Sequence, residues 1–436
     1  MAIIKSFRAI RYNPERVNLR DVITEPYDRI TPAMQDDYYQ RSTYNVVRII
    51  LGKDDEPHPE KNKYKRAKIY IDEWLKEGIF IREDKKALYI YQQKFRVDGK
   101  EMVRNGLIGA VKLEEFSSKK VLPHEKTFPK PKEDRFNLLT ATNTNTEQIF
   151  LLYDDEDGKI RNLLESALKN AKKAFSVEDE DGITHSLFII TDDETIREIQ
   201  KLLAPKSLII ADGHHRYETS LLYKKENEKR RKSEEEPFDY IMMTLFAIQD
   251  ENLVILPTHR LVKGLKTLDF SFEDILSPYF EVKEEKEPER DDEWMEVRRL
   301  IKGEKHSFIA YFPAFKKIFK LKLKEGSDWM TFMEKEKSPE WKSLDVSILH
   351  SLIFKKMDSL FEGGFSVEKN ISYVRNILDG IKQVKEGKYQ GIFILNPVRL
   401  EEIKKVVERG ELMPEKSTDF YPKLKSGILM FPLDEI

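Results

Sequence analysis

The sequence has no cysteine among its 436 residues and only 8 histidines. The lack of cysteine excludes disulfide bonds, thiolate metal sites and a cysteine nucleophile. A metal ion could be held only by histidine, aspartate or glutamate. No two histidines fall in the H-E-x-x-H or H-x-H spacing that can place two imidazoles on one metal ion. A His/Asp/Glu metal-dependent hydrolase is therefore the weakest of the enzyme hypotheses.

The chain also lacks long apolar runs and an apolar leader. No stretch approaches the roughly 20 apolar residues that cross a bilayer. The first segment, MAIIKSFRAIRYNPE, has neither an extended apolar core nor a small-residue cleavage site. We expect a cytoplasmic protein with no membrane partner.

Neither sign of charge is in excess, because 76 basic residues stand against 78 acidic ones, for a net charge of −2. No nucleic-acid partner is expected, since such proteins carry a strongly basic surface. Charged residues nevertheless make up 35% of the chain. This abundance is typical of a thermophile protein with surface ion-pair networks, and it also fits an ordinary solvated surface.

The chain does contain enough apolar sequence, 40% of its residues, for more than one core. We predict a helix over Lys63–Gly78, a β-hairpin around Asp98-Gly99, and strands over Val46–Leu51 and Ser207–Ala211. Helices and strands are mixed without regular βαβ alternation. The predicted fold class is therefore α+β with a mixed sheet and an additional α/β C-terminal region.

Domain organisation is predicted from length and charge. Two domains are expected, over residues 1–270 and 271–436, and a third is compatible with the length. The charge-rich stretch Glu281–Arg298 is interpreted as a boundary region, with a solvated helix as the alternative.

The strongest candidate site is IADGHHRYE, Ile210–Glu218, where an apolar strand runs through a polar loop into a helix. Backbone N–H groups at a helix start attract anions, and the helix dipole adds to this attraction. Gly213 lets a ligand approach the backbone, Arg216 can grip phosphate oxygens, and Asp212 can hold a divalent cation or act as a base. The alternative is a plain helix start capped by Asp212. The candidate catalytic residues here are Asp212, His214 and His215.

Further clusters lie far away in the sequence, and ordinary polar loops are the alternative for each. Lys416-Ser417-Thr418 is interpreted as an anion-binding turn, although it lacks the leading glycines of a Walker loop. His124 and Glu125 are candidate acid/base groups or metal ligands. The candidate phosphate- or nucleotide-binding residues are Tyr27, Asp28, Arg135, Thr258, His259, Arg260, Lys416, Ser417, Thr418 and Lys423.

Together these segments resemble, almost end to end, a large family of prokaryotic proteins known only as a domain of unknown function. The resemblance is carried by EPYDRI (Glu25–Ile30), YNVVRI (Tyr44–Ile49), GLIGAVKLEEF (Gly106–Phe116), LPHEKTF (Leu122–Phe128), KEDRFNLL (Lys132–Leu139), IADGHHRYETSLLY (Ile210–Tyr223), LPTHRLV (Leu256–Val262), LDVSILH (Leu344–His350), ILNP (Ile394–Pro397) and GELMPEKSTDFYPKLKSG (Gly410–Gly427). One departure is Glu25, where a second proline or a small residue is expected before PYD.

The DGHHR segment in turn is similar to the phosphate loop of the ParB/sulfiredoxin-like superfamily. Members of that superfamily bind or cleave nucleotides, and they include free serine kinases. The resemblance implies a ParB/sulfiredoxin-like core in residues 1–270, with Asp212–Arg216 lining the phosphates.

The leading hypothesis is a phosphotransferase or phosphohydrolase that acts on a small metabolite, with serine or phosphoserine as first candidate and ADP or ATP as the nucleotide. Positioning and charge neutralisation would do most of the catalysis, with Mg²⁺ held at Asp212. The second hypothesis is a nucleotide-binding sensor or regulatory module without turnover. A homo-oligomer is left open.

Overall fold

The computed structural model describes residues 2–125 and 130–436. These residues fall into two compact units. Unit 1 contains three described segments, residues 2–123, residues 130–254 and Pro422–Ile436. Unit 2 contains His124, Glu125 and Ile255–Tyr421. The units differ from the two domains predicted over 1–270 and 271–436, which stay a prediction.

Unit 1 is built on a mixed sheet that has nine strands within the described part of the chain, in the order β6-β11-β8-β12-β5-β4-β10-β9, with β1 beside β5. β11 runs parallel to β6 and β12 runs parallel to β8, while the other neighbours are antiparallel. This architecture confirms the α+β class. The strands are β1 (Ile4–Lys5), β4 (Leu88–Val97), β5 (Lys100–Lys112), β6 (Val121–Leu122), β8 (Ile149–Tyr153), β9 (Lys172–Glu178), β10 (Thr184–Ile190), β11 (Leu208–Asp212) and β12 (Tyr240–Ala247).

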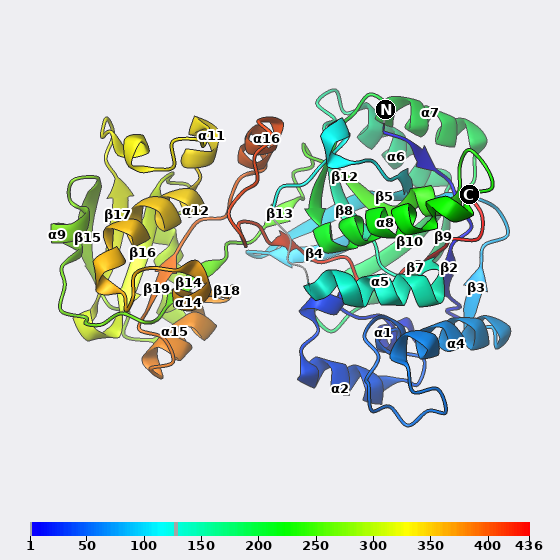
Figure 1. Ribbon diagram of the computed structural model, residues 1–436, viewed down its shortest axis with the longest axis horizontal. Coiled ribbons are helices and arrows are strands. Elements are labelled where there is room, and N and C mark those ends of the chain that lie inside the picture. Colours follow the sequence, from blue (N-terminus) through cyan, green and yellow to red (C-terminus); the bar gives the residue numbers. More distant parts are fainter. Residues whose placement is uncertain (1, 126–129) are drawn as a thin grey trace. The chain divides into compact units, whose positions relative to one another are not determined.

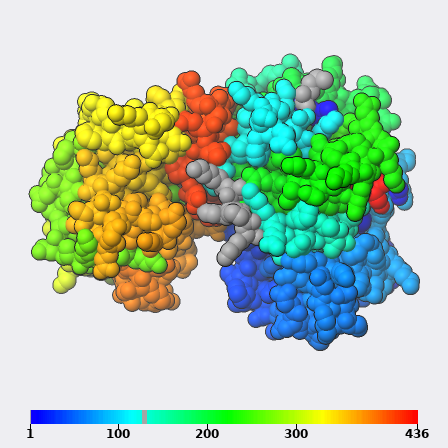
Figure 2. All heavy atoms as spheres, viewed as in Figure 1, coloured from blue at the N-terminus to red at the C-terminus, as the bar shows by residue number. Residues whose placement is uncertain are grey.

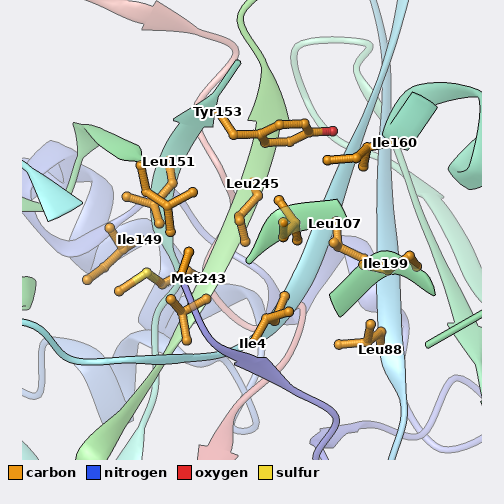
Figure 3. Close-up of a cluster of buried hydrophobic side chains, with 14 of the residues drawn as sticks. Ile4, Leu88, Leu107, Ile149, Leu151, Tyr153, Ile160, Ile199, Met243 and Leu245 are labelled. Carbon is orange, nitrogen blue, oxygen red and sulfur yellow. The ribbon is translucent and has the colours of Figure 1, made fainter. Parts of the chain in front are cut away.

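Helices α6 (Lys159–Asn170), α7 (Asp193–Leu203) and α8 (His214–Asn227) contribute to the core on one face of this sheet. Alternate apolar side chains of the strands point toward them, as period-two patterning requires. Figure 3 shows part of this cluster, with Leu151, Leu245 and Leu107 from three strands and Ile160 of α6 and Ile199 of α7.

The first and last segments of the chain pack on the opposite face. The Phe7 ring lies 5.3 Å from that of Tyr89 and 4.8 Å from that of Phe431. Strand β21 (Phe431–Pro432) pairs with β7 (Thr144–Asn145), so the last residues belong to unit 1. Figure 1 shows both chain ends on this unit.

Further helices and one strand pair complete unit 1. Within it, the N-terminal helices and α5 form one continuous surface, blue to turquoise in Figure 2. The elements are α1 (Leu19–Val22), α2 (Pro32–Arg41), α3 (Val47–Ile50), α4 (Lys63–Lys76) and α5 (Lys130–Thr142), with the strand pair β2 (Ile10–Tyr12) and β3 (Phe80–Arg82).

The local predictions have mixed outcomes. The hairpin is confirmed, with Asp98 and Gly99 at φ values of 50° and 78° that suit its tight turn. The strand predicted over Val46–Leu51 is wrong, because these residues form α3. The Asn45 side chain accepts a hydrogen bond from the Val47 N–H at 2.9 Å and starts that helix. A short apolar run does not by itself distinguish a buried strand from a buried helix.

Unit 2 contains an antiparallel sheet with six strands in the described part of the chain, in the order β15-β17-β16-β19-β14-β18. Helices α10 and α15 contribute to the core on one face. On the other face, the Phe354 ring of α13 lies 5.1 Å from the Phe393 ring of β19. The strands are β14 (His259–Val262), β15 (Phe280–Lys286), β16 (Ser307–Phe312), β17 (Lys317–Leu323), β18 (Ile371–Val374) and β19 (Gly391–Ile394). The helices are α9 (Phe272–Leu276), α10 (Trp294–Val297), α11 (Pro339–Lys342), α12 (Asp345–Ile348), the π-helical turn η9 (Leu349–Ile353), α13 (Phe354–Lys356), α14 (Val367–Asn370), α15 (Ile377–Lys385) and α16 (Leu400–Glu408).

The charge-rich stretch Glu281–Arg298 forms part of β15 and α10 inside unit 2. None of the helices in the described residues is long and apolar enough to span a membrane.

Candidate functional site

The candidate site of unit 1 is the turn between β11 and α8. β11 ends at Asp212 with an irregular register against β8, and α8 begins at His214. Gly213 links them at a φ of 94°, a backbone conformation that glycine adopts without strain. Gly213 has no side chain to cap α8, and the Asp212 carboxylate accepts a hydrogen bond from the Gly213 N–H at 2.9 Å. The helix start therefore directs backbone N–H groups and the positive end of its dipole toward this turn.

Two cationic side chains flank the turn. The Lys423 ammonium lies 3.3 Å from Oδ2 of Asp212. The Arg216 guanidinium folds back over Gly213, so that a Cβ at that glycine would come within 3.1 Å of it. Arg216 also donates a hydrogen bond to the Gln148 carbonyl oxygen. This is the charge pattern that a phosphate group needs.

Two carboxylates near the turn differ in proton affinity. Burial would raise the pKa of Asp212, but the charges of Lys423 and Arg216 outweigh it and hold that pKa well below its usual range. The surrounding protein and the charge of Asp212 raise the pKa of Asp28. Asp28 keeps an exposed surface, so water damps this rise. The Asp28 carboxylate forms no hydrogen bond or ion pair with the described residues, which leaves it available to a ligand.

Glu147 organises the neighbouring side chains. Its carboxylate accepts hydrogen bonds from the Tyr27 N–H at 3.0 Å and the Ser426 hydroxyl at 2.9 Å, and it pairs with Arg135 at 3.2 Å. The Arg135 guanidinium stacks over the Tyr27 ring, 4.0 Å from its centroid. Arg135, Glu147 and Arg216 line a cavity of about 40 Å³. Glu147 is not among the residues predicted from the sequence, although a glutamate beside an apolar strand was a signal for it.

A buried charge network supports the turn that carries Lys423. The Lys425 ammonium lies 2.6 Å from Glu25 and 3.0 Å from Asp179. His185 contacts Asp179 at 3.0 Å and the Tyr91 hydroxyl at 2.7 Å. Burial would raise the pKa of Asp179, but its hydrogen bond with His185 and the charge of Lys425 hold that pKa well below its usual range. Among these residues only Glu25 was singled out in the sequence, as part of the EPYD turn.

The remaining predicted residues lie in unit 2, where His124, Glu125 and Arg260 contact the segment Lys416–Thr418. Glu125 accepts hydrogen bonds from the backbone N–H groups of Ser417 at 3.1 Å and Thr418 at 3.3 Å. His124 contacts the Thr418 hydroxyl at 2.8 Å. An internal carboxylate thus occupies the N–H groups that an anion at Lys416–Thr418 would use. The Lys126–Phe128 part of LPHEKTF lies outside the described residues.

Strand β14 places its polar residues inside unit 2. His259 is 1% exposed, and its Nδ1 accepts a hydrogen bond from the Leu395 N–H at 3.3 Å. Arg260 is 1% exposed and donates to the carbonyl oxygens of Thr258 and Lys416. A ligand-binding role for Thr258, His259 and Arg260 stays a prediction.

The predicted residues therefore separate into two sets. The set in unit 1 is Tyr27, Asp28, Arg135, Asp212, Gly213, His214, His215, Arg216 and Lys423, and the set in unit 2 is His124, Glu125, Thr258, His259, Arg260, Lys416, Ser417 and Thr418. Within the described residues no group of three or more His, Asp or Glu side chains could hold a metal ion. Asp212 as a metal ligand stays a prediction.

The fold and this site define an α+β protein with a strand-to-helix turn flanked by two cationic side chains. The chain belongs to the family described as "Protein of unknown function (DUF1015)", whose model matches residues 4–347. This confirms the family resemblance seen in the sequence. No curated protein matches the chain.

The solved structures that match this chain share little sequence with it. A conserved hypothetical protein from Pyrococcus furiosus is 17% identical, with a TM-score of 0.31 and coverage of 70% of this chain and 89% of the other. A free serine kinase in complex with AMP is 16% identical, with a TM-score of 0.33 and coverage of 69% and 83%. SbnI with a C-terminal truncation from Staphylococcus aureus is 11% identical, with a TM-score of 0.33 and coverage of 75% and 87%.

Proposed function

We propose that unit 1 binds nucleotide phosphates at the Asp212–Arg216 turn and transfers a phosphoryl group to or from a small metabolite. The observation that supports this most directly is the turn from β11 through Gly213 into the start of α8, with the Arg216 and Lys423 side chains beside it. A helix N-terminus with two flanking cations is suited to a charged phosphate chain.

Each side chain has a distinct role in the proposed reaction. The N–H groups at the start of α8, with Arg216 and Lys423, hold and neutralise the phosphates. The oxygen of an acceptor hydroxyl attacks the terminal phosphorus, and the bond from that phosphorus to its bridging oxygen breaks. Asp28 accepts the hydroxyl proton, because its carboxylate is available and the pKa of Asp28 is raised. His214 and His215 are the alternative proton carriers of this unit.

A magnesium ion fits this arrangement. Mg²⁺ is held by one or two carboxylates together with substrate phosphates, and Asp212 would supply a carboxylate here. The ion would add positive charge at the phosphate oxygens when nucleotide is bound.

The test is turnover and binding by the full chain with Mg²⁺, ATP or ADP, and serine, and in the reverse direction with phosphoserine. Arg216→Ala should lose both nucleotide affinity and turnover. Asp28→Asn should keep affinity and lose about 10²- to 10⁴-fold in turnover, as expected for a general base. Arg290→Ala, at a side chain that is 70% exposed in unit 2, is the matched control.

The outcomes separate the two functional hypotheses. Full turnover in Arg216→Ala and His215→Ala would refute the proposed site. Tight nucleotide binding by calorimetry with no product after long incubation would instead support a sensor without turnover.

A further inference from the structure

A second feature, in unit 2, is the buried guanidinium of Arg260 on β14. Its Nη2 donates to the Lys416 carbonyl oxygen at 3.1 Å, and Nη1 donates to that of Thr258. Nε has no hydrogen-bond partner among the described residues. No ion pair reaches Arg260 from them either, and Glu125 acts on it only at longer range. A buried charge without a paired counter-charge is unfavourable, so its retention needs a reason.

Arg104 of unit 1 provides a contrast, because it is a buried guanidinium that the chain does satisfy. Its Nε and Nη2 donate to the Gln93 side chain at 3.0 and 2.7 Å. Three aromatic rings surround it, the nearest centroid being that of Phe246 at 5.0 Å. Arg260 has one such ring, Tyr373, with a centroid at 5.4 Å. The Nε and Nη2 groups of Arg104 therefore have acceptors within the chain, whereas Nε of Arg260 has none among the described residues.

Three more polar groups in this part of unit 2 lack hydrogen-bond partners among the described residues. They are the Tyr373 hydroxyl, Nε2 of His350 and the Ser347 hydroxyl. Tyr373 pairs directly with Arg260 across the β14–β18 ladder, so both side chains lie on one face of the sheet. His350 follows Ser347 by three residues along α12 and η9, which places them on one helical face.

The helical segment that carries Ser347 and His350 continues into α13, which packs on this sheet face. Phe354 contacts Phe393, and Phe393 is the neighbour of Arg260 in the β14–β19 ladder. Burial and the charge of Arg260 lower the pKa of His350 to about 3, so its imidazole is neutral near pH 7. His350 also lies in a π-helical turn, a conformation that is frequent at functional sites.

We propose that Arg260, Tyr373, His350 and Ser347 bind the carboxylate group of a small molecule, at a site separate from the phosphate-binding turn. The four groups together carry one positive charge. That charge neutralises one carboxylate, whereas a bound phosphate dianion would keep one uncompensated negative charge. Nε and the remaining Nη2 N–H of Arg260 form the fork that accepts a carboxylate with two hydrogen bonds. The four polar atoms are covered in this structure, so the ligand enters as Tyr373, on the edge strand β18, swings outward.

The experiment uses acetate as the probe and the full chain as the receptor. Saturation-transfer NMR on the acetate methyl protons is recorded at constant ionic strength for wild type, Arg260→Met and Arg216→Met. We expect the signal in wild type and Arg216→Met, and its loss in Arg260→Met. The thermal midpoint of Arg260→Met should equal or exceed that of wild type, because an apolar side chain of similar length removes an unpaired buried charge.

Several outcomes would overturn this proposal. An unchanged acetate signal in Arg260→Met would remove Arg260 from the site, and a lower thermal midpoint would show that Arg260 serves stability. If Arg260→Met does not fold, Tyr373→Phe replaces it as the test. An acetate signal in Tyr373→Phe as strong as in wild type would contradict the proposal. If inorganic phosphate displaces acetate at lower concentrations than formate does, the site binds phosphate in preference to a carboxylate.

Discussion

At the residue scale, Gly213 and Arg216 illustrate how much of the candidate site depends on a single backbone conformation. Gly213 has a φ of 94°, and its missing Cβ is the space into which the Arg216 guanidinium folds. The sequence alone indicated both residues, because a glycine and an arginine at a strand-to-helix turn suit phosphate binding. It could not indicate that they contact each other.

Gly213→Ala should therefore weaken nucleotide binding more than it destabilises the fold. The added Cβ would lie 3.1 Å from the Arg216 guanidinium, at a φ that alanine adopts with strain of about 1–2 kcal/mol. Calorimetry with ADP and urea denaturation measure the two effects. Gly182→Ala is the control, since its φ is 73° and no atom lies near the added Cβ. Equal loss of ADP affinity in both variants would contradict the prediction.

Lys425→Met should destabilise the protein strongly. Its side chain is 3% exposed and neutralises Glu25 and Asp179, so its removal leaves two uncompensated carboxylates and costs about 3–5 kcal/mol. Lys5→Met is the matched control, because Lys5 and its partner Glu235 are 29% and 37% exposed and an exposed pair contributes at most ~1 kcal/mol. Urea denaturation gives both values. Similar losses in the two variants would show that the Lys425 network is not what stabilises this region.

At the scale of elements, pattern length decided which predictions succeeded. The helix predicted over Lys63–Gly78 and the Asp98-Gly99 hairpin are confirmed by α4, β4 and β5. These segments are long, and their periodicity or turn chemistry is unambiguous. Val46–Leu51 is short and mostly apolar, so its pattern could not distinguish a buried strand from the helix α3 that the structure shows.

The strand β14 provides a pH prediction through His259. Burial lowers the pKa of His259 to about 3, below the value near 6.5 of an unfolded chain. The unfolded state then binds more protons below pH 6.5, so stability present above that pH is lost as the pH falls toward 3. Lowering the pH from 7.5 to 5.0 should therefore reduce the free energy of unfolding by on the order of 2 kcal/mol through protonation of this histidine in the unfolded state.

His259→Asn should reduce that acid loss, because asparagine is neutral and can keep an acceptor for the Leu395 N–H. Urea denaturation at the two pH values measures the difference. His58→Asn is the control, since Nδ1 of His58 also accepts a backbone hydrogen bond, from Glu60 at 3.0 Å, but at a half-buried position. An acid loss in His259→Asn equal to that of wild type would be incompatible with a neutral buried imidazole.

At the scale of the whole molecule, the last segment of the chain completes unit 1. Pro422–Ile436 supplies Lys423 to the turn, Lys425 to the buried network and Phe431 to the contact with Phe7. This return of the chain explains why the compact units differ from the two ranges predicted from sequence.

Truncation after Tyr421 should therefore abolish nucleotide binding and protection of the unit 1 sheet from hydrogen exchange. Truncation after Leu433 is the control, because it removes Asp434, whose 2.6 Å pair with Arg82 is largely exposed, and leaves β21 in place. Exchange measured on peptides from β4 and β5 gives the comparison. Retained protection after truncation at Tyr421 would show that unit 1 folds without its last segment.

The sequence by itself determined the α+β class, the family and the Asp212–Arg216 turn, because periodicity, turn chemistry and local motifs act over a few residues. Only the tertiary structure decided which distant residues join that turn. It brought Lys423 to Asp212 and Glu147 into contact with Tyr27 and Arg135, while Arg260 and Glu125 belong to the other unit. Such pairings depend on strand order and on the path of the chain between strands, and residue spacing does not encode either. Glu147 thus belongs to the site because of its position in the fold.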